Sequence, residues 1–120
     1  MSKKTYHPDR GDLVMLNFFP AAGREIDKRR LGVVISPIEY NRASGLCVVV
    51  PATTDLRAGP LYVPAPAGTF DQPSQFLCDL FRSVDYRERS IVTLGKRLDP
   101  ATLDEITACL LELIDPVYRG

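Results

Sequence analysis

Short apolar segments that end at proline are the feature that most constrains how this chain can fold. Residues 12–19 are apolar and end at Pro20, and residues 31–36 end at Pro37. Proline cannot donate a hydrogen bond to a strand ladder, so each segment predicts a short strand. Residues 46–50 form an unbroken and mostly β-branched run, which predicts a third strand that is buried on both faces.

The segments between and after these strands give weaker signals. Residues 21–30 are too polar to pack and predict a solvent-facing loop, while residues 41–45 supply turn-forming side chains. Residues 55–74 are rich in glycine and proline, which permits only a short edge strand near residues 61–63. Further strands are expected at residues 75–84 and 91–94.

The C-terminal segment predicts the one convincing helix of the chain, over about residues 100–115. Asp99 suits the N-cap, Pro100 suits the first helical position, and Pro116 ends the helix. An apolar stripe at spacings of three and four is expected to lie on the sheet. Its members are Leu103, Ile106, Leu110, Leu113 and Ile114. The fold class is therefore mainly β with α, a small β-barrel or curled sheet closed by this helix.

Composition limits both the domain count and the chemistry. A chain of 120 residues suffices for one domain, here residues 1–120 with a polar tail at residues 1–5. Cys47, Cys78 and Cys109 are widely spaced and have apolar neighbours, so they predict buried thiols rather than disulfides or zinc ligands. His7 is the one histidine, which argues against metal binding and against Ser-His or Cys-His nucleophiles.

No apolar run approaches the roughly 20 residues of a membrane helix, and the polar N-terminus does not resemble a signal peptide. These observations predict a cytoplasmic protein that does not bind membranes. The formal net charge is zero, but residues 1–97 carry 14 basic and 10 acidic side chains. A basic face is therefore possible on a neutral protein. Its candidate members are Arg24, Lys28, Arg29 and Arg30 in one cluster, and Arg82, Arg87, Arg89, Lys96 and Arg97 in another.

Two segments place reactive side chains next to predicted strands. Arg30 directly precedes the second strand, and Thr53 and Thr54 follow the third. The planar guanidinium of arginine donates two hydrogen bonds to a phosphate, and a threonine hydroxyl can donate another. The alternative interpretation is structural, with ion pairs for Arg30 and ordinary strand or turn roles for the threonines. Asp79 lies in an apolar stretch, where a water-exposed sheet face is the simplest interpretation.

An ordered set of short motifs over about residues 6–114 resembles the MazF/PemK family of bacterial toxin endoribonucleases. The motifs are Tyr6-His-Pro-Asp-Arg-Gly-Asp-Leu-Val14, Gly23-x-Glu25, Arg30-x-x-Val-Val-Ile-Ser-Pro37, Tyr40-Asn41, Gly45-Leu46, Val50-Pro-x-Thr-Thr54 and Asp79-x-x-Arg-Ser-Val84. The resemblance implies an SH3-like small β-barrel of the CcdB/MazF/PemK type that forms a homodimer. It also implies sequence-specific cleavage of single-stranded RNA, chiefly messenger RNA, which inhibits translation and growth. A cognate antitoxin would neutralise the toxin with an acidic, disordered tail.

The resemblance also assigns roles to individual residues. Arg30 matches the catalytic arginine of the family, Thr53 its partner threonine, and Glu25 the acidic residue of the Gly-x-Glu loop. The RNA-binding candidates are Arg24, Lys28, Arg29, Thr54, Asp79 and Arg82. Three positions depart from the family pattern. Arg24 stands where many relatives have a histidine, Leu77 where some members have an arginine, and Leu80 where the usual residue is a glutamine.

The mechanism that the resemblance implies uses neither a metal nor another cofactor. Arg30 would stabilise charge on the phosphorane-like state with help from Thr53, and Glu25 would act as base or orienter. The products would be a 2′,3′-cyclic phosphate and a 5′-hydroxyl. Stacking of unpaired bases on Tyr6, Phe19 or Phe70 would contribute to selection, and residues 21–29 and 55–74 would set specificity. The alternative is a non-catalytic binding module or a gyrase poison of the same fold.

Overall fold

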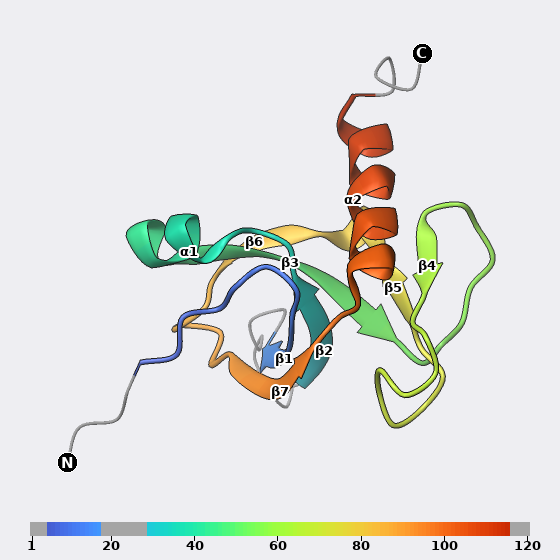
Figure 1. Cartoon of the computed structure of the whole chain (residues 1–120). Helices are drawn as coiled ribbons and strands as arrows, with labels where there is room; N and C mark the ends of the chain where they lie inside the picture. Colours follow the sequence, from blue (N-terminus) through green and yellow to red (C-terminus); the bar gives the residue numbers. More distant parts are fainter. Residues whose placement is uncertain (1–4, 18–28, 116–120) are drawn as a thin grey trace, which may run out of the picture.

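The computed structural model describes residues 5–17 and 29–115, and it is built around an antiparallel sheet with a C-terminal helix (Figure 1). The strands are β1 (Asp12–Asn17), β2 (Arg29–Val34), β3 (Leu46–Thr53), β4 (Tyr62–Pro64), β5 (Gln75–Leu77), β6 (Arg82–Asp85) and β7 (Val92–Arg97). The helices are α1 (Ile38–Ser44), the 3-10 turn η1 (Cys78–Leu80) and α2 (Pro100–Ile114).

The strand order within the described residues is β4-β5-β3-β2-β1-β7, and β6 also pairs with β3. Every pairing in this sheet is antiparallel. The ladder is open, with β4 and β7 at its ends, but the sheet curls strongly around β1 and β2 (Figure 1). The predicted fold class, mainly β with a C-terminal helix, is therefore confirmed.

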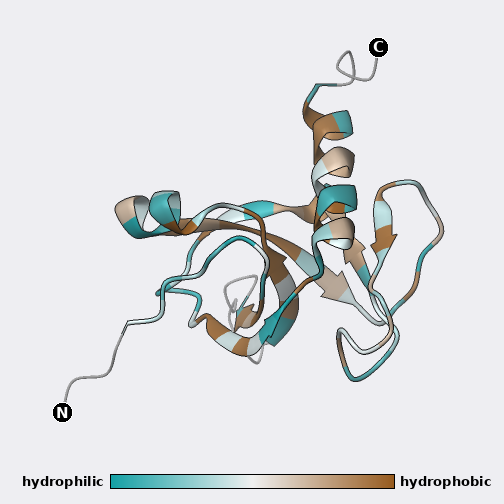
Figure 2. Ribbon diagram, viewed as in Figure 1, coloured by the Kyte–Doolittle hydropathy of each residue, from teal (hydrophilic) through white to brown (hydrophobic). Residues whose placement is uncertain are grey.

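The two faces of the curled sheet bury separate hydrophobic clusters because side chains alternate along each strand. One cluster lies under α2 and includes Val33, Val50 and Ile106. The other includes Val34, Val49 and Tyr86. Both clusters are formed around the same central strands, which are the most apolar part of the ribbon in Figure 2. Burial of β3 on both faces, as predicted from its sequence, is confirmed.

Helix α2 begins as its sequence predicts. The Asp99 carboxylate accepts the Thr102 backbone N–H at 3.0 Å, and the hydrogen bonds to Thr102 lower the pKa of Asp99. Ile106, Cys109 and Leu110 are buried against the sheet. The prediction for the end of the stripe is wrong, because Leu113 and Ile114 are 38% and 66% exposed. The last turn of α2 extends beyond the sheet (Figure 1).

Helix α1 is a correction to the sequence analysis, which predicts only turn residues before β3. Its seven residues are too few to show an apolar stripe, and tertiary contacts hold it in place. Asn41 is fully buried and its side chain donates to the backbone oxygens of Pro8 and Ser36. Gly45 caps the helix in the left-handed conformation, with φ of 78°, which favours glycine.

Some strand boundaries also differ from the prediction. The segment predicted as one strand at residues 75–84 is interrupted by η1, which packs against α2. The last strand is β7, which extends to Arg97 rather than ending at residue 94. Strand β3 continues through Pro51, opposite Gly32, to Thr53. A Cβ on Gly32 would lie 2.8 Å from both Val49 Cγ1 and the Val50 oxygen, so glycine permits this close approach.

The three cysteines are free and buried, as predicted. Burial raises the pKa of Cys47 and of Cys78 to about 12, so both remain protonated thiols at neutral pH. Within the described part of the chain, no helix is long and apolar enough to cross a membrane.

Candidate functional site

The pairing of β2 with β3 brings Arg30 and Thr53 together. Gly32 pairs with Pro51, Val33 with Val50 and Val34 with Val49, and beyond the pair of Gly32 with Pro51, Arg30 and Thr53 line the same cavity. Both side chains lie on the sheet face of Val34 and Val49, by alternation along their strands. Two residues that are 23 positions apart in the sequence therefore meet at one end of the sheet.

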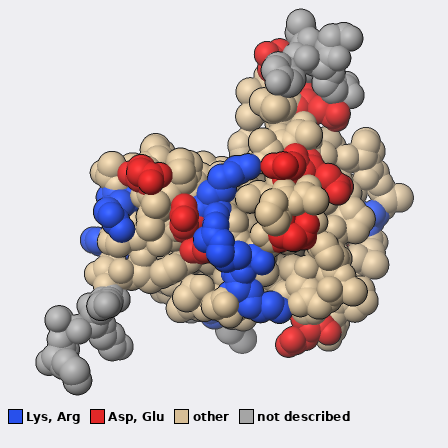
Figure 3. All heavy atoms as spheres, viewed as in Figure 1, with Lys and Arg blue, Asp and Glu red and all other residues tan. Residues whose placement is uncertain are grey.

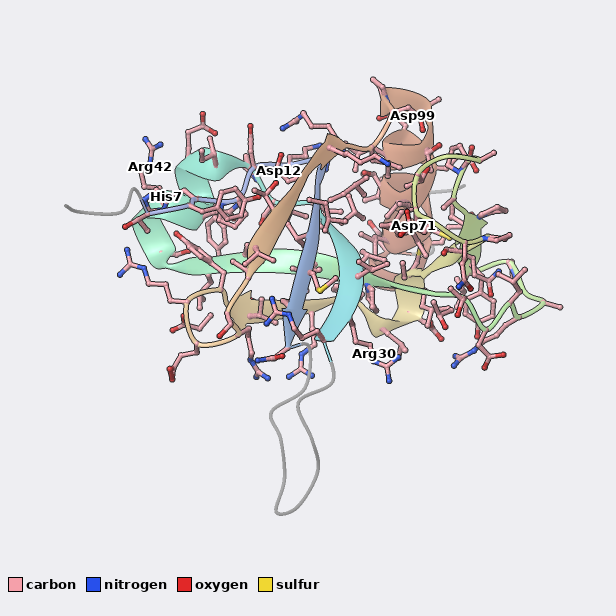
Figure 4. All side chains as sticks on the ribbon, turned by 90° about the horizontal axis from the view of Figure 1, so that it is seen from below. His7, Asp12, Arg30, Arg42, Asp71 and Asp99 are labelled. Atoms are coloured by element: carbon pink, nitrogen blue, oxygen red, sulfur yellow. The ribbon has the colours of Figure 1, made fainter. Side chains whose placement is uncertain are left out.

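A small open cavity of about 190 Å³ lies at this end of the sheet. It is lined by residues 29–31 of β2, by residues 52–54 at the end of β3, and by Ser74. The Thr53 hydroxyl oxygen accepts the Asp55 backbone N–H at 3.0 Å, which orients the oxygen and leaves its own proton free to donate. Figure 4 shows Arg30 pointing away from the body of the sheet.

Among the described residues, the Arg30 guanidinium has no hydrogen bond or ion pair with another side chain or with the backbone. An arginine fork and a hydroxyl that converge on an open cavity are suited to bind a phosphate. The structural alternative for Arg30, an ion pair with Glu25 or Asp27, involves residues outside the described ranges. Arg24 and Lys28 also lie outside them.

Arg29 lines the same cavity but is partly used by the fold. Its Nη2 donates to the backbone oxygens of Ser90 at 2.8 Å and Met15 at 3.3 Å. These bonds connect the start of β2 to the turn before β7. The remaining N–H groups of the guanidinium stay available to a ligand, so Arg29 can act as both a support and a phosphate contact.

Asp79 and Arg82 occupy different surroundings. Asp79 is exposed on η1, beside α2, and is not among the residues that line the cavity of Arg30 and Thr53. Arg82 is half-buried in β6 and lies on the sheet face of Val84. That face is also the face of Thr53, because Val84 and Val49 belong to the same cluster. Arg82 pairs with Val49, four residues from Thr53 along β3.

A second, larger cavity of about 490 Å³ adjoins the first. The two share Leu31, Thr54 and Ser74 as lining residues. Among its lining residues, Met15 and Asp71 were not singled out from the sequence. No local pattern marks them, since they come from β1 and from the segment between β4 and β5.

The most conspicuous basic feature lies elsewhere. Figure 3 shows Lys and Arg side chains in a continuous band across one face, flanked by acidic patches. Arg97 and Lys96 of the second predicted cluster are bonded within the protein. The Arg97 Nη1 donates to Asp12 Oδ1 at 2.7 Å, and Lys96 Nζ donates to the Gly68 and Thr69 oxygens at 2.8 and 3.1 Å. These cations are therefore mainly structural.

The described residues contain no group of three or more His, Cys, Asp or Glu side chains that could hold a metal ion. The fold and the site thus define a small α+β protein with a cationic, hydroxyl-bearing site at one end of an antiparallel sheet. Residues 9–114 match the family of PemK-like, MazF-like toxins of type II toxin-antitoxin systems. The chain belongs to this family.

Individual relatives are similar to this chain in sequence and structure over nearly its whole length. The chain is 35% identical over 109 residues to the endoribonuclease toxin MazF of Escherichia coli K12, which covers 91% of this chain and 96% of the relative. A crystal structure of MazF from Deinococcus radiodurans superposes with a TM-score of 0.80 at 36% identity, covering 92% and 98% of the two chains. The toxin in a MazE-MazF structure from the same organism gives a TM-score of 0.82 at 36% identity, covering 92% and 97%.

Proposed function

We propose that this protein is a sequence-specific, metal-independent endoribonuclease that cleaves single-stranded RNA, chiefly messenger RNA, as the toxin of a toxin-antitoxin system. The observation that supports the proposal is the open cavity that Arg30 and Thr53 both line. Membership of a toxin family and the 35% identity to an endoribonuclease toxin support the same reaction.

The site is suited to transesterification at a phosphodiester. The ribose 2′-oxygen attacks the phosphorus, the bond from phosphorus to the 5′-oxygen breaks, and the products are a 2′,3′-cyclic phosphate and a 5′-hydroxyl. Arg30 binds the non-bridging oxygens and stabilises their developing charge, and the Thr53 hydroxyl donates to one of them. Arg29 and Thr54, at the same cavity, contact the flanking phosphates.

The roles of Glu25 and Arg30 in proton transfer are assigned from the positions that they match in the family. Glu25 takes the 2′-hydroxyl proton or orients that hydroxyl, and Arg30 donates a proton to the departing 5′-oxygen. Arg24, Lys28 and Arg82 supply further contacts to the RNA backbone. Asp79 is the weakest RNA-binding candidate, because it is exposed on η1 beside α2 and away from the cavity.

Regulation and assembly follow from the same family. A cognate antitoxin with an acidic, disordered tail covers the site, where an acidic segment complements Arg29 and Arg30. The chain forms a homodimer through exposed apolar side chains on η1 and the end of α2. These are Leu80, Leu113 and Ile114. The protein acts in the bacterial cytoplasm, where its messenger RNA substrates are translated.

The test is cleavage of a long single-stranded RNA in EDTA by the purified protein and its Arg30→Ala variant, with mapping of the 5′ ends. We expect discrete cuts at one short recurring sequence that are absent with the variant. Cleavage that requires Mg²⁺ would overturn the mechanism. Intact RNA with a folded, antitoxin-free protein would overturn the proposed activity and favour a non-catalytic binding module or a gyrase poison.

A further inference from the structure

The larger cavity beside the Arg30 and Thr53 site is built differently from the site itself. Its lining includes apolar side chains from three strands, which are Met15 of β1, Leu31 of β2 and Leu94 of β7. Its volume of about 490 Å³ lies in the range typical of sites for small organic groups. Because it shares Leu31, Thr54 and Ser74 with the smaller cavity, a group bound there is continuous with a phosphate at Arg30.

An aromatic ring lines one side of this cavity in a fixed orientation. Phe70 is half-buried, and its ring packs against the buried ring of Phe76 with centroids 5.9 Å apart and an interplanar angle of 56°. The loop that carries Phe70 is attached to β7, because Lys96 donates hydrogen bonds to the Gly68 and Thr69 oxygens. A supported aromatic face of this kind is suited to stack on an unpaired base.

The carboxylate of Asp71 in this cavity favours a base rather than a phosphate as the part of the RNA that binds there. Asp71 is an exposed lining residue, and no hydrogen bond or ion pair joins it to another side chain in the described ranges. In the view of Figure 4, Asp71 lies between Arg30 and Asp99, and Asp99 is the residue that caps the start of α2. A free carboxylate repels a phosphate, but it accepts hydrogen bonds from the N–H groups of a base edge.

We propose that this cavity binds the nucleobase next to the scissile phosphate, stacked near Phe70, and that Asp71 selects bases with an exocyclic amino group over uracil. The proposal rests on the proposed function, since it names how the same site selects its RNA. Adenine, cytosine and guanine each carry an exocyclic amino group that can donate to a carboxylate. Uracil has the O4 acceptor where cytosine has its amino group, so a carboxylate at that position is repelled by O4 and the N3–H is the one base donor that remains. Asp71 is thus a specificity-determining residue, while Lys96 positions the loop that carries Phe70.

The test compares short RNAs that contain the mapped cut site and differ only in the base on either side of it. With the wild-type protein, uracil at one of these two positions should lower kcat/KM by about tenfold or more relative to the preferred amino-bearing base. Asp71→Asn should reduce this ratio to about threefold or less, because the amide can also donate to uracil O4. Asp104→Asn, which removes the same charge from an exposed position on α2, should retain the full ratio.

Two results would overturn the proposal while leaving cleavage intact. One is a wild-type preference for uracil at both flanking positions, and the other is an unchanged ratio in Asp71→Asn. If the wild-type protein cut no RNA, the proposed function would fail, and binding would still decide the inference. NMR titrations with AMP and UMP should then show tighter AMP binding that Asp71→Asn weakens, whereas equal binding of both nucleotides would reject the base site.

Discussion

The two ends of β2 both carry polar side chains, but they use them in opposite ways. Beyond the end of β2, Ser36 Oγ donates to Asn41 Oδ1 at 2.6 Å and accepts the Val48 backbone N–H at 2.8 Å. The Tyr86 hydroxyl donates to the Asn41 backbone oxygen at 3.2 Å and lies 2.8 Å from His7 Nδ1. The His7 tautomer determines which group donates in the second bond.

At the start of β2, by contrast, Arg30 and Thr53 converge on an open cavity. The Thr53 proton and the Arg30 guanidinium have no protein acceptor among the described residues. Figure 4 shows His7 and Asp12 well away from Arg30. Polar groups that form hydrogen bonds with one another stabilise the fold, whereas polar groups that converge without protein partners are available to a ligand.

The largest expected effect is the loss of cleavage in Arg30→Ala. Removing a cation that stabilises the transition state should lower kcat by about 10²–10³-fold. The free energy of unfolding should change by no more than about 0.5 kcal/mol, since the side chain is exposed and makes no bond to the described residues. Single-turnover cleavage and urea denaturation measure the two quantities. A large loss of stability in this variant would break the contrast between the ends of β2.

Asn41→Ala should have the opposite signature. It leaves the Pro8 and Ser36 backbone oxygens without their donor and should lower the free energy of unfolding by about 3 kcal/mol. The fraction that remains folded should still cut RNA at the wild-type sequence. Arg42→Ala, at an exposed position on the same helix, is the control and should change stability by less than about 0.5 kcal/mol. Equal stability of the two variants would contradict a structural role for the buried network.

Thr53→Val tests the Thr53 hydroxyl, whose contribution to cleavage should be smaller than that of Arg30. Valine keeps the shape and the β-branch of threonine but removes the donor, so cleavage should fall by about tenfold to a hundredfold. Thr53→Ser should restore most of the rate, because it retains the hydroxyl. The measurement is the cleavage rate of each variant at saturating RNA. A fully active Thr53→Val would remove Thr53 from the mechanism and leave Arg30 alone.

The smallest effect is expected for Arg97→Gln. The Arg97 side chain is 58% exposed, although its partner Asp12 is only 14% exposed, so the loss of stability should stay below about 1 kcal/mol. High salt should reduce the difference further, because salt screens exposed charges. Urea denaturation in low and high salt is the measurement. A stable variant with strongly weakened RNA cleavage would instead show that Arg97 takes part in RNA binding.

The contrast between α2 and α1 explains which elements the sequence could predict. Helix α2 carries its own signals in Asp99, Pro100 and an apolar stripe, and each acts within a few residues. Helix α1 depends on Asn41, whose partners include Pro8, 33 positions away. No local sequence pattern indicates such a bond, so the sequence predicts a turn for this segment. The exposure of Leu113 and Ile114 has a similar cause, because only packing decides where the sheet ends.

The short strands, the buried cysteines and helix α2 could be predicted from local sequence, since propensity, alternation and capping act over a few residues. The motif order also pointed to Arg30 and Thr53. The pairing of β2 with β3, which leaves these two residues at one cavity, could be seen only in the folded structure. The folded structure also joined Met15, Phe70 and Asp71 around one cavity. Such contacts depend on how the curled sheet packs, and the free energy of that packing is shared by the whole chain rather than by any local segment.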